Sequence, residues 1–337
     1  MSYLQQLPDM PPISDRLTLL RLRALLAACE TGPMPHAPGS TLHGAIGRAI
    51  KHTACAFPDA AHRPCAGCAV LARCTYPPLF EPQPIPGQSS PPPALLLAPG
   101  AAMPARLQPG SIVPIDLVLV GKAIQALPLL LAVLARMASA GLGPLRVPCT
   151  IVRVDAVDAA GTPYAAVQVG AEVAGREPDP LTTRAWLYRA STLPGVGTVT
   201  CDIRTRLRLQ RQGFVSSDAP TFADVAKALV RRAAALAAAH CAEDAPFPDP
   251  RPWLAAAESI ELREAHLRWE QHERRSARTG HTMPLDGFLG RLTYGGPPES
   301  LALFVLILLL GETIGLGRGC SFGNGRYSLD LPTANAP

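Results

Sequence analysis

Lysine is almost missing from the chain, which has 3 lysines and 28 arginines among its 337 residues. Long hydrophobic runs are missing too, because the longest, from Leu301 to Leu310, is about half of what a bilayer needs. No basic-then-apolar segment of the signal-peptide type leads the sequence. We therefore expect a cytoplasmic protein with no membrane contact, whose nine cysteines are reduced thiols or metal ligands rather than disulfides.

Arginine is the residue that the sequence has in excess. A GC-rich coding bias explains that excess without any function, whereas the alternative is the use of planar guanidinium groups to bind phosphates and base edges. The net charge of +5 is too small to decide between the two, so the positions of the arginines must decide. The hydrophobic content of 48% excludes a globally disordered chain, and the length suits one large or two ordinary domains.

Hydrophobic periodicity divides the first half of the chain into a β-α-(loop)-β-α-β pattern. Strands are predicted at residues 16–26, 111–121 and 145–157, and a strongly apolar helix at residues 122–140. Another helix is predicted after the turn at Pro38, with Ser40 as its N-cap. Proline dominates residues 77–104, so no regular structure is expected there.

The second half of the chain repeats this theme. The predicted elements are a strand at residues 198–209, helices at 221–241, 251–278 and 299–310, a short strand at 290–294 and a last strand after the final glycines. Arg204, Arg206 and Arg208 alternate along the first of these strands, so we expect them on a single exposed face. Basic strands of this kind suit single-stranded or hairpin RNA better than duplex DNA.

The predicted fold class is therefore α+β, with two domains. Residues 1–157 would form the first domain, which carries a cysteine- and proline-rich insertion at residues 55–104. Residues 158–337 would form the second, with a basic helical insertion at about residues 242–282 and a glycine-rich loop at 315–325.

The glycine-rich loop lies within IGLGRGCSFGNGRYSL, residues 314–329. No GK[ST] sequence follows, which excludes a P-loop, and Cys320 stands where a dinucleotide-binding fingerprint needs its third glycine. Glycine lets a backbone come close to a ligand and turns its amides outward as an anion-binding nest. The two remaining interpretations are a loop that approaches RNA phosphate and a loop needed only for tight domain packing.

The segment GLGRGCSFGNGRYSL resembles the C-terminal glycine-rich signature of the RAMP superfamily, the CRISPR-associated RNA-binding proteins. Within that superfamily it is most similar to the endoribonucleases that process precursor CRISPR RNA. Three further stretches resemble the same family in the expected order: APGSTLHGAIGRAI at residues 37–50, RTRLRL at 204–209, and residues 268–294.

The resemblance implies tandem ferredoxin-like (RRM-like) domains and metal-independent cleavage of a repeat hairpin. The 2′-hydroxyl beside the scissile phosphate would attack, leaving a 2′,3′-cyclic phosphate and a 5′-hydroxyl, with no cofactor. The partners implied are precursor and mature CRISPR RNA, with the product retained, and other Cas subunits of an effector complex. Two alternatives stay open: a non-cleaving RAMP subunit that binds the mature guide, and an RNA-binding adaptor stabilised by zinc.

Members of the family often carry a histidine on or just after the first helix, where this chain offers His36, His43 and His52. His43 is our candidate general base, because the positive end of the helix dipole would keep it neutral; the alternative is a surface histidine. Arg23 would neutralise charge at the same site, because arginine cannot serve as a base at ordinary pH. Its alternative is an exposed strand arginine.

The candidate RNA-binding residues come from four segments. They are Arg48 and Lys51 on the outer face of the first helix, Arg204, Arg206 and Arg208 on the strand, Arg274, Arg275 and Arg278 at the end of the charged helix, and Gly315, Gly317, Arg318, Gly319, Ser321, Gly323, Gly325 and Arg326 in the loop. The charged helix resembles the helical finger of the type IV branch of the family. Its balanced charges also fit a solvated helix face with i,i+4 pairs.

Four cysteines form the pattern C-x9-C-x2-C-x5-C at Cys55, Cys65, Cys68 and Cys74. Four thiolates satisfy tetrahedral zinc, and a C-x2-C pair is the usual half-site. The hypotheses are a structural zinc ion, an iron–sulfur cluster, and cysteines that are simply reduced.

Overall fold

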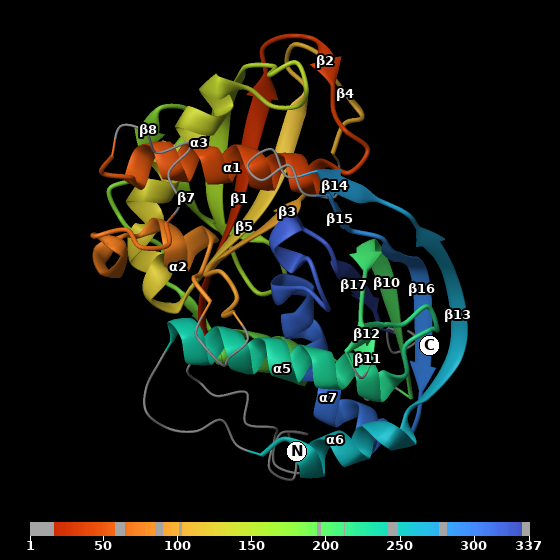
Figure 1. Ribbon diagram of the computed structural model, residues 1–337. Coiled ribbons are helices and arrows are strands. Elements are labelled where there is room, and N and C mark those ends of the chain that lie inside the picture. The colour runs from red at the N-terminus through yellow and green to blue at the C-terminus, as the bar shows by residue number, and fades with distance from the viewer. Residues whose placement is uncertain are drawn as a thin grey trace.

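The structure is a computed structural model, and it describes residues 17–57, 65–84, 90–100, 103–193, 197–211, 213–241, 249–275 and 282–331. Two α+β units follow one another along the chain, each built on an antiparallel sheet (Figure 1). The predicted fold class is confirmed.

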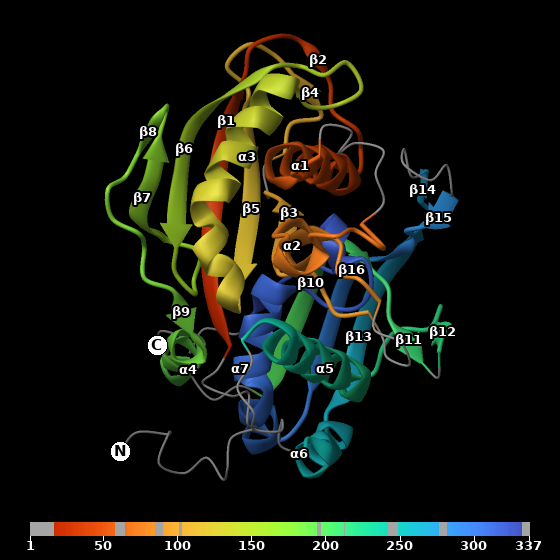
Figure 2. The same cartoon turned by 60° about the vertical axis from the view of Figure 1, so that its left-hand side comes forward.

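The first unit has the element order β1-α1-β3-β5-α3-β6. These are β1 (Thr18–Ala28), α1 (Pro38–Ala54), β3 (Leu95–Pro99), β5 (Ile112–Val120), α3 (Leu127–Ala140) and β6 (Cys149–Val157). The strands pair antiparallel in the order β3-β5-β1-β6, which is the ferredoxin-like topology. Figure 2 shows α1 and α3 over one face of this sheet.

Several shorter elements complete the first unit. They are β2 (Gly32–Pro33) paired with β4 (Arg106–Leu107), α2 (Tyr76–Phe80), β7 (Pro163–Val169) and β8 (Glu172–Val173) beyond β6, β9 (Leu181–Thr182) paired with β1, and α4 (Thr183–Ser191). Because β7, β8 and β9 belong to the first sheet, that sheet extends past the boundary expected at residue 157.

The second unit repeats the topology. It consists of β10 (Thr198–Leu207), α5 (Phe222–His240), β13 (Glu261–Glu270), β16 (Gly287–Gly295), α7 (Pro298–Ile314) and β17 (Tyr327–Asp330), with sheet order β13-β16-β10-β17. The shorter elements are β11 (Gln210–Arg211), β12 (Phe214–Val215), α6 (Arg251–Ala256), β14 (Glu273–Arg275) and β15 (Thr282–Pro284). Four short 3-10 turns also occur in the described chain, of which Cys320–Phe322, within the glycine-rich loop, matters below.

Strand β1 explains how the two units pack together. Side chains alternate across a strand, and those at even positions from Leu20 to Ala28 join α1 and α3 in the first core. Leu17 and Leu19 point to the other face, where they join the second core with α5 and α7. The two units therefore share buried apolar surface around one end of β1.

The apolar segments expected to be helical are core helices. Ten of the 17 residues of α7 are buried, and its Phe304 ring and aliphatic side chains lie in the second core with those of α5 and β10. Residues Gly121–Ala140 are long and apolar enough to span a membrane by composition alone. In the structure their helical part packs against α1 and β6 within the first core.

Three predictions about local structure are wrong. Of the charged segment 251–278, the structure describes residues 251–275, and these are α-helical only at α6. Glu261–Glu270 is the edge strand β13, so the described residues do not form the expected helical finger. Helix α1 begins at Pro38, with Ala37 rather than Ser40 at the N-cap. The proline-rich segment contains α2 and the sheet strand β3.

Candidate functional site

A pocket of about 210 Å³ opens between the two units. It is lined by the start of α1, the end of β3, three residues of β10, the end of β13 and the glycine-rich loop. We call it the interdomain pocket, and its lining residues are His36, Ala37, Pro38, Gly39, Ser40, Pro99, Arg204, Thr205, Arg206, Arg268, Glu270, His272, Leu285, Leu289, Phe322, Gly323 and Asn324. In Figure 1, β14 and β15 reach across from the second sheet toward α1 beside this pocket.

Two histidines from different units line the interdomain pocket. His36 is exposed just before α1, and His272 is half-buried just after β13. Burial lowers the pKa of His272, and the positive charges of Arg206 and His36 lower it further, against the opposing effect of Glu270. His272 is therefore neutral at pH 7, with a ring nitrogen able to accept a proton.

The arginines of the pocket differ in how far they are committed to protein partners. Arg206 is only 7% exposed and pairs with Glu270 at 3.0 Å. Arg268 reaches the same carboxylate at 3.3 Å with its side chain largely exposed, and Arg204 pairs with Asp202 at 3.2 Å. Three guanidinium groups against one carboxylate leave the lining net positive, as a phosphate-binding site requires.

The glycine-rich loop packs into the contact between the units. A Cβ on Gly39 of α1 would lie 2.2 Å from the carbonyl oxygen of Phe322, and one on Gly323 would lie 2.8 Å from Pro99. Gly323 also has a φ of +76°, a conformation that favours glycine. These close approaches bear out the tight-packing interpretation of the loop, and they place Gly323 on the pocket wall.

Several loop residues predicted to bind RNA are turned inward. Gly315, Gly323 and Gly325 are buried. Arg326 donates to the carbonyl groups of Glu312, Thr313 and Leu97, so it connects α7 with β3. Burial lowers the pKa of Arg326 to about 10. Arg318 remains exposed, whereas Gly317, Gly319 and Ser321 are half-buried.

The structure separates the two residues predicted to be catalytic. Arg23 lies at an odd position of β1 and pairs with Asp116 at 2.8 Å, on the face opposite to α1. The ring of His43 lies on α1 between the rings of Phe80 and Phe322, with centroid distances of 4.2 and 4.3 Å. The expectation that Arg23 reaches the site of His43 is wrong, and neither residue lines the interdomain pocket.

The other residues predicted to contact RNA differ in their exposure to solvent. Arg48 is exposed as expected, but Lys51 is only 6% exposed and does not face solvent. The prediction that the three arginines of this segment share one exposed face is also wrong. A register shift after Ile203 buries Arg206, while Arg204 stays exposed and Arg208 is half-buried. Arg274 and Arg275 lie in β14, and Arg278 falls outside the described residues.

The comparison with family models decides the identity of the second unit. Residues 202–327 match the model of CRISPR-associated endoribonuclease Cas6, and residues 17–177 match a model described as an N-terminal domain. The second unit is therefore similar to Cas6 endoribonucleases over residues 202–327. This similarity agrees with the resemblance of the sequence to the endoribonucleases that process precursor CRISPR RNA. No curated protein matches the chain significantly.

Solved structures of Cas6 proteins share the fold. A Cas6 product complex has a TM-score of 0.54 at 16% identity, covering 93% of this chain and 99% of that one. Thermus thermophilus Cas6 has a TM-score of 0.54 at 15% identity, with the same coverage. A chain of a partial Cas6-RT-Cas1–Cas2 complex has a TM-score of 0.58 at 13% identity. The match covers 95% of the present protein and 47% of that chain.

The four cysteines of the predicted metal site line a separate pocket of about 170 Å³ beside Lys51 and Tyr76. Burial raises the pKa of the Cys65 thiol, and Lys51 opposes that rise. Among the residues that the structure describes, no three histidine, cysteine or acidic side chains are arranged to hold a metal ion. The thiols converge on one pocket but do not surround a common centre.

Proposed function

We propose that this chain cleaves precursor CRISPR RNA within the repeat and that cleavage takes place in the interdomain pocket. The observation that carries the proposal is the pair His36 and His272, which comes from two different units and lies on one net-positive wall. The match of residues 202–327 to the Cas6 model supplies the substrate class. The site proposed here therefore replaces the pair His43 and Arg23 that the sequence suggested.

The chemistry is transfer of the scissile phosphorus from the 5′-oxygen of one nucleotide to the 2′-oxygen of its neighbour. His272, which is neutral, accepts the proton of the 2′-hydroxyl as the 2′-oxygen forms its bond to phosphorus. The bond from phosphorus to the 5′-oxygen breaks, and His36 in its protonated form donates a proton to that oxygen. The products are a 2′,3′-cyclic phosphate and a 5′-hydroxyl.

The arginines stabilise the charge that develops during this transfer. Arg204 and Arg268 have exposed side chains that can reach a phosphate oxygen in the pocket. Arg206 is held in place by its ion pair with Glu270, so its charge is preorganised. No step in this scheme uses a metal ion. We also propose that the product stays bound and that the chain joins other Cas subunits, in keeping with its similarity in fold to a Cas6 product complex and to a chain of a Cas6-RT-Cas1–Cas2 complex.

Incubation of the protein with repeat RNA of the host's CRISPR array in EDTA tests the proposal. We expect one defined cut per repeat, with a 5′ fragment ending in a cyclic phosphate and a 3′ fragment that a polynucleotide kinase can label directly. A mobility shift without a cut would support the non-cleaving RAMP subunit instead. The absence of both binding and cleavage would contradict both interpretations.

A further inference from the structure

A second and larger pocket, of about 780 Å³, lies on the side of the second unit that carries α5. Its lining includes the basic side chains of Arg208, Arg211, Lys227, Arg231, Arg232 and Arg318. Within the described part of the chain, Asp224 is the one carboxylate of that lining. We call this the basic pocket, and six cations against one acid give it a strongly positive potential.

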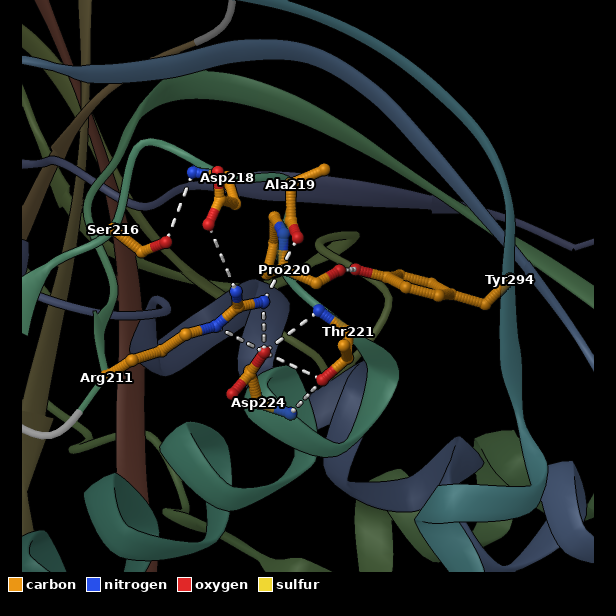
Figure 3. A network of polar contacts seen from close by, with 8 residues as sticks. All are labelled: Arg211, Ser216, Asp218, Ala219, Pro220, Thr221, Asp224 and Tyr294. Atoms are coloured by element: carbon orange, nitrogen blue, oxygen red, sulfur yellow. Dashed lines mark hydrogen bonds and ion pairs between the residues drawn. The ribbon is translucent and has the colours of Figure 1, made fainter.

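Three of these cations are committed to the protein. Arg211 donates to Asp224 at 2.6 and 2.9 Å and to the carbonyl oxygen of Ala219 at 3.1 Å, as Figure 3 shows. Asp224 in turn accepts from Thr221 and closes the capping box at the start of α5. Arg208 pairs with Asp286 at 3.3 Å, and Arg232 donates to the carbonyl oxygen of Ile314 at 2.6 Å.

The other three cations are available to a ligand. Lys227, Arg231 and Arg318 are exposed, and none of their side chains makes a hydrogen bond or ion pair with another residue that the structure describes. Lys227 and Arg231 stand four positions apart on α5, so they project from the same face of the helix. Arg318 lies in the glycine-rich loop, and its backbone N–H donates to the carbonyl oxygen of Arg208.

Two segments run from the basic pocket to the interdomain pocket. Along β10 and the residues after it, Arg204 and Arg206 line the interdomain pocket while Arg208 and Arg211 line the basic pocket. In the glycine-rich loop, Phe322 to Asn324 line the interdomain pocket while Gly317 and Arg318 line the basic pocket. An RNA strand bound at one pocket would therefore reach the other along β10 and the glycine-rich loop, which both carry arginines.

An exposed aromatic residue directly follows a lining residue of the basic pocket in the sequence. Gln210, Arg211 and Gly213 line the pocket and belong to the small hairpin of β11 and β12. Phe214 follows in β12 and is 79% exposed. An exposed ring beside unpaired cations is the combination that binds single-stranded nucleic acid, because bases stack on the ring while phosphates contact the cations.

We propose that the basic pocket binds the single-stranded RNA that adjoins the repeat hairpin, with its phosphates on Lys227, Arg231 and Arg318 and one base stacked on Phe214. The pocket is too small to enclose a duplex, whereas successive phosphates of one strand fit cations that lie one helical turn apart. This inference rests on the proposed function for the identity of the RNA. It adds a sequence-independent contact away from the cut.

The test measures binding and cleavage separately on the full chain. Two probes are used, the repeat RNA with its single-stranded flanks and the same RNA trimmed to the hairpin, each with a 2′-deoxy sugar at the cut to prevent cleavage. We expect Lys227→Glu and Arg231→Glu to weaken binding of the flanked RNA about tenfold each and to flatten its salt dependence. Phe214→Ala should weaken the same complex with its salt slope unchanged.

The matched control is Arg136→Glu, which reverses an exposed arginine on α3 that lines neither pocket. This control should leave the affinity for both RNA probes unchanged. The three pocket variants should leave the affinity for the trimmed hairpin unchanged. Cleavage of saturated RNA should keep its wild-type rate in Arg136→Glu. Equal weakening for both probes would overturn the inference in favour of a stem contact, and unchanged binding would exclude RNA from the pocket. If RNA binds as expected but is never cut, the proposed function alone fails.

Discussion

Gly39 at the start of α1 lies against the backbone of Phe322 in the glycine-rich loop, so closely that a Cβ on Gly39 would stand 2.2 Å from the Phe322 carbonyl oxygen. This contact joins the two units beside the interdomain pocket. Gly39→Ala must push the loop away, and we expect it to lower the free energy of unfolding by about 1–3 kcal/mol and to reduce RNA cleavage. Thermal unfolding and single-turnover cleavage measure the two effects.

Gly44→Ala is the matched control for that substitution. Gly44 is in the same helix, and a Cβ there would meet only the end of the flexible Arg48 side chain, at 3.6 Å. Since alanine has the higher helix propensity, this variant should be up to about 1 kcal/mol more stable than the wild type. Equal stability of the two variants would show that Gly39 does not sustain the interdomain contact.

The buried ion pair of Arg206 and Glu270 supports the wall of the pocket. Glu270→Gln leaves the Arg206 guanidinium buried without its counter-charge, so we expect a loss of about 3 kcal/mol in unfolding free energy. Glu264→Gln, on the same strand but with an exposed carboxylate, should change stability by less than about 1 kcal/mol. Chemical denaturation of both variants measures the difference, and similar curves would contradict a structural role for the pair.

His240 makes the stability of the fold depend on pH. It is buried at the end of α5, where burial lowers its pKa against the opposing hydrogen bond with Pro92 at 2.7 Å. The unfolded chain therefore binds a proton more readily than the folded chain once the pH falls below about 6.5. We expect the melting temperature to fall as the pH decreases from about 6.5 toward 5, and less so in His240→Gln. An identical slope in that variant would assign the effect to other groups.

Structural zinc at Cys55, Cys65, Cys68 and Cys74 stays a prediction. Their thiols line one pocket, and binding requires the side chains to rotate toward a common centre. We expect about one zinc per chain in protein purified without chelator, and loss of zinc with a lower melting temperature in Cys68→Ser. Cys29→Ser, an exposed cysteine elsewhere, should change neither. Metal-free protein with all four thiols open to titration would contradict the prediction.

The arrangement of the main strands and helices was predictable because their apolar periodicity is long and regular. β1 alternates across both cores, and α5 keeps a helical stripe that begins at a capping box on Thr221. The likeness of the two halves then indicated a repeated α+β unit, and the family resemblance implied that this unit is ferredoxin-like. Sheet extensions such as β8 and β9 escaped prediction because two-residue strands carry no periodicity of their own.

Strand β13 was mistaken for a helix because charges three and four positions apart fit both structures. From Glu264 to Glu270, however, charged residues alternate with Ala265, Leu267 and Trp269, which is the period of a strand. Leu267 packs on the second core and Trp269 contacts the ring of Phe288. Glu264, His266 and Arg268 are exposed, and the half-buried Glu270 pairs with Arg206. The period of two was the signal that could have identified it.

The candidate site could be predicted only in part. His36 was visible as one of three histidines near the first helix, but the wrong N-cap at Ser40 favoured His43, which packs between aromatic rings. His272 had no signal in the sequence, because its place opposite His36 depends on β13 crossing to the first unit. The roles of Arg206 and Arg326 were hidden for the same reason, since burial is decided by packing between distant segments.

Single-turnover cleavage of repeat RNA with either oxygen or sulfur at the 5′-bridging position tests the two-histidine site most directly. Sulfur leaves without needing a proton, so the account predicts that His36→Ala slows cleavage of the oxygen substrate by roughly a hundredfold or more and is rescued by sulfur. His272→Ala should be equally slow with both substrates, and His266→Ala, an exposed histidine of β13, should cleave both at the wild-type rate. Wild-type rates in both His36→Ala and His272→Ala, with loss of cleavage in His43→Ala, would contradict the account.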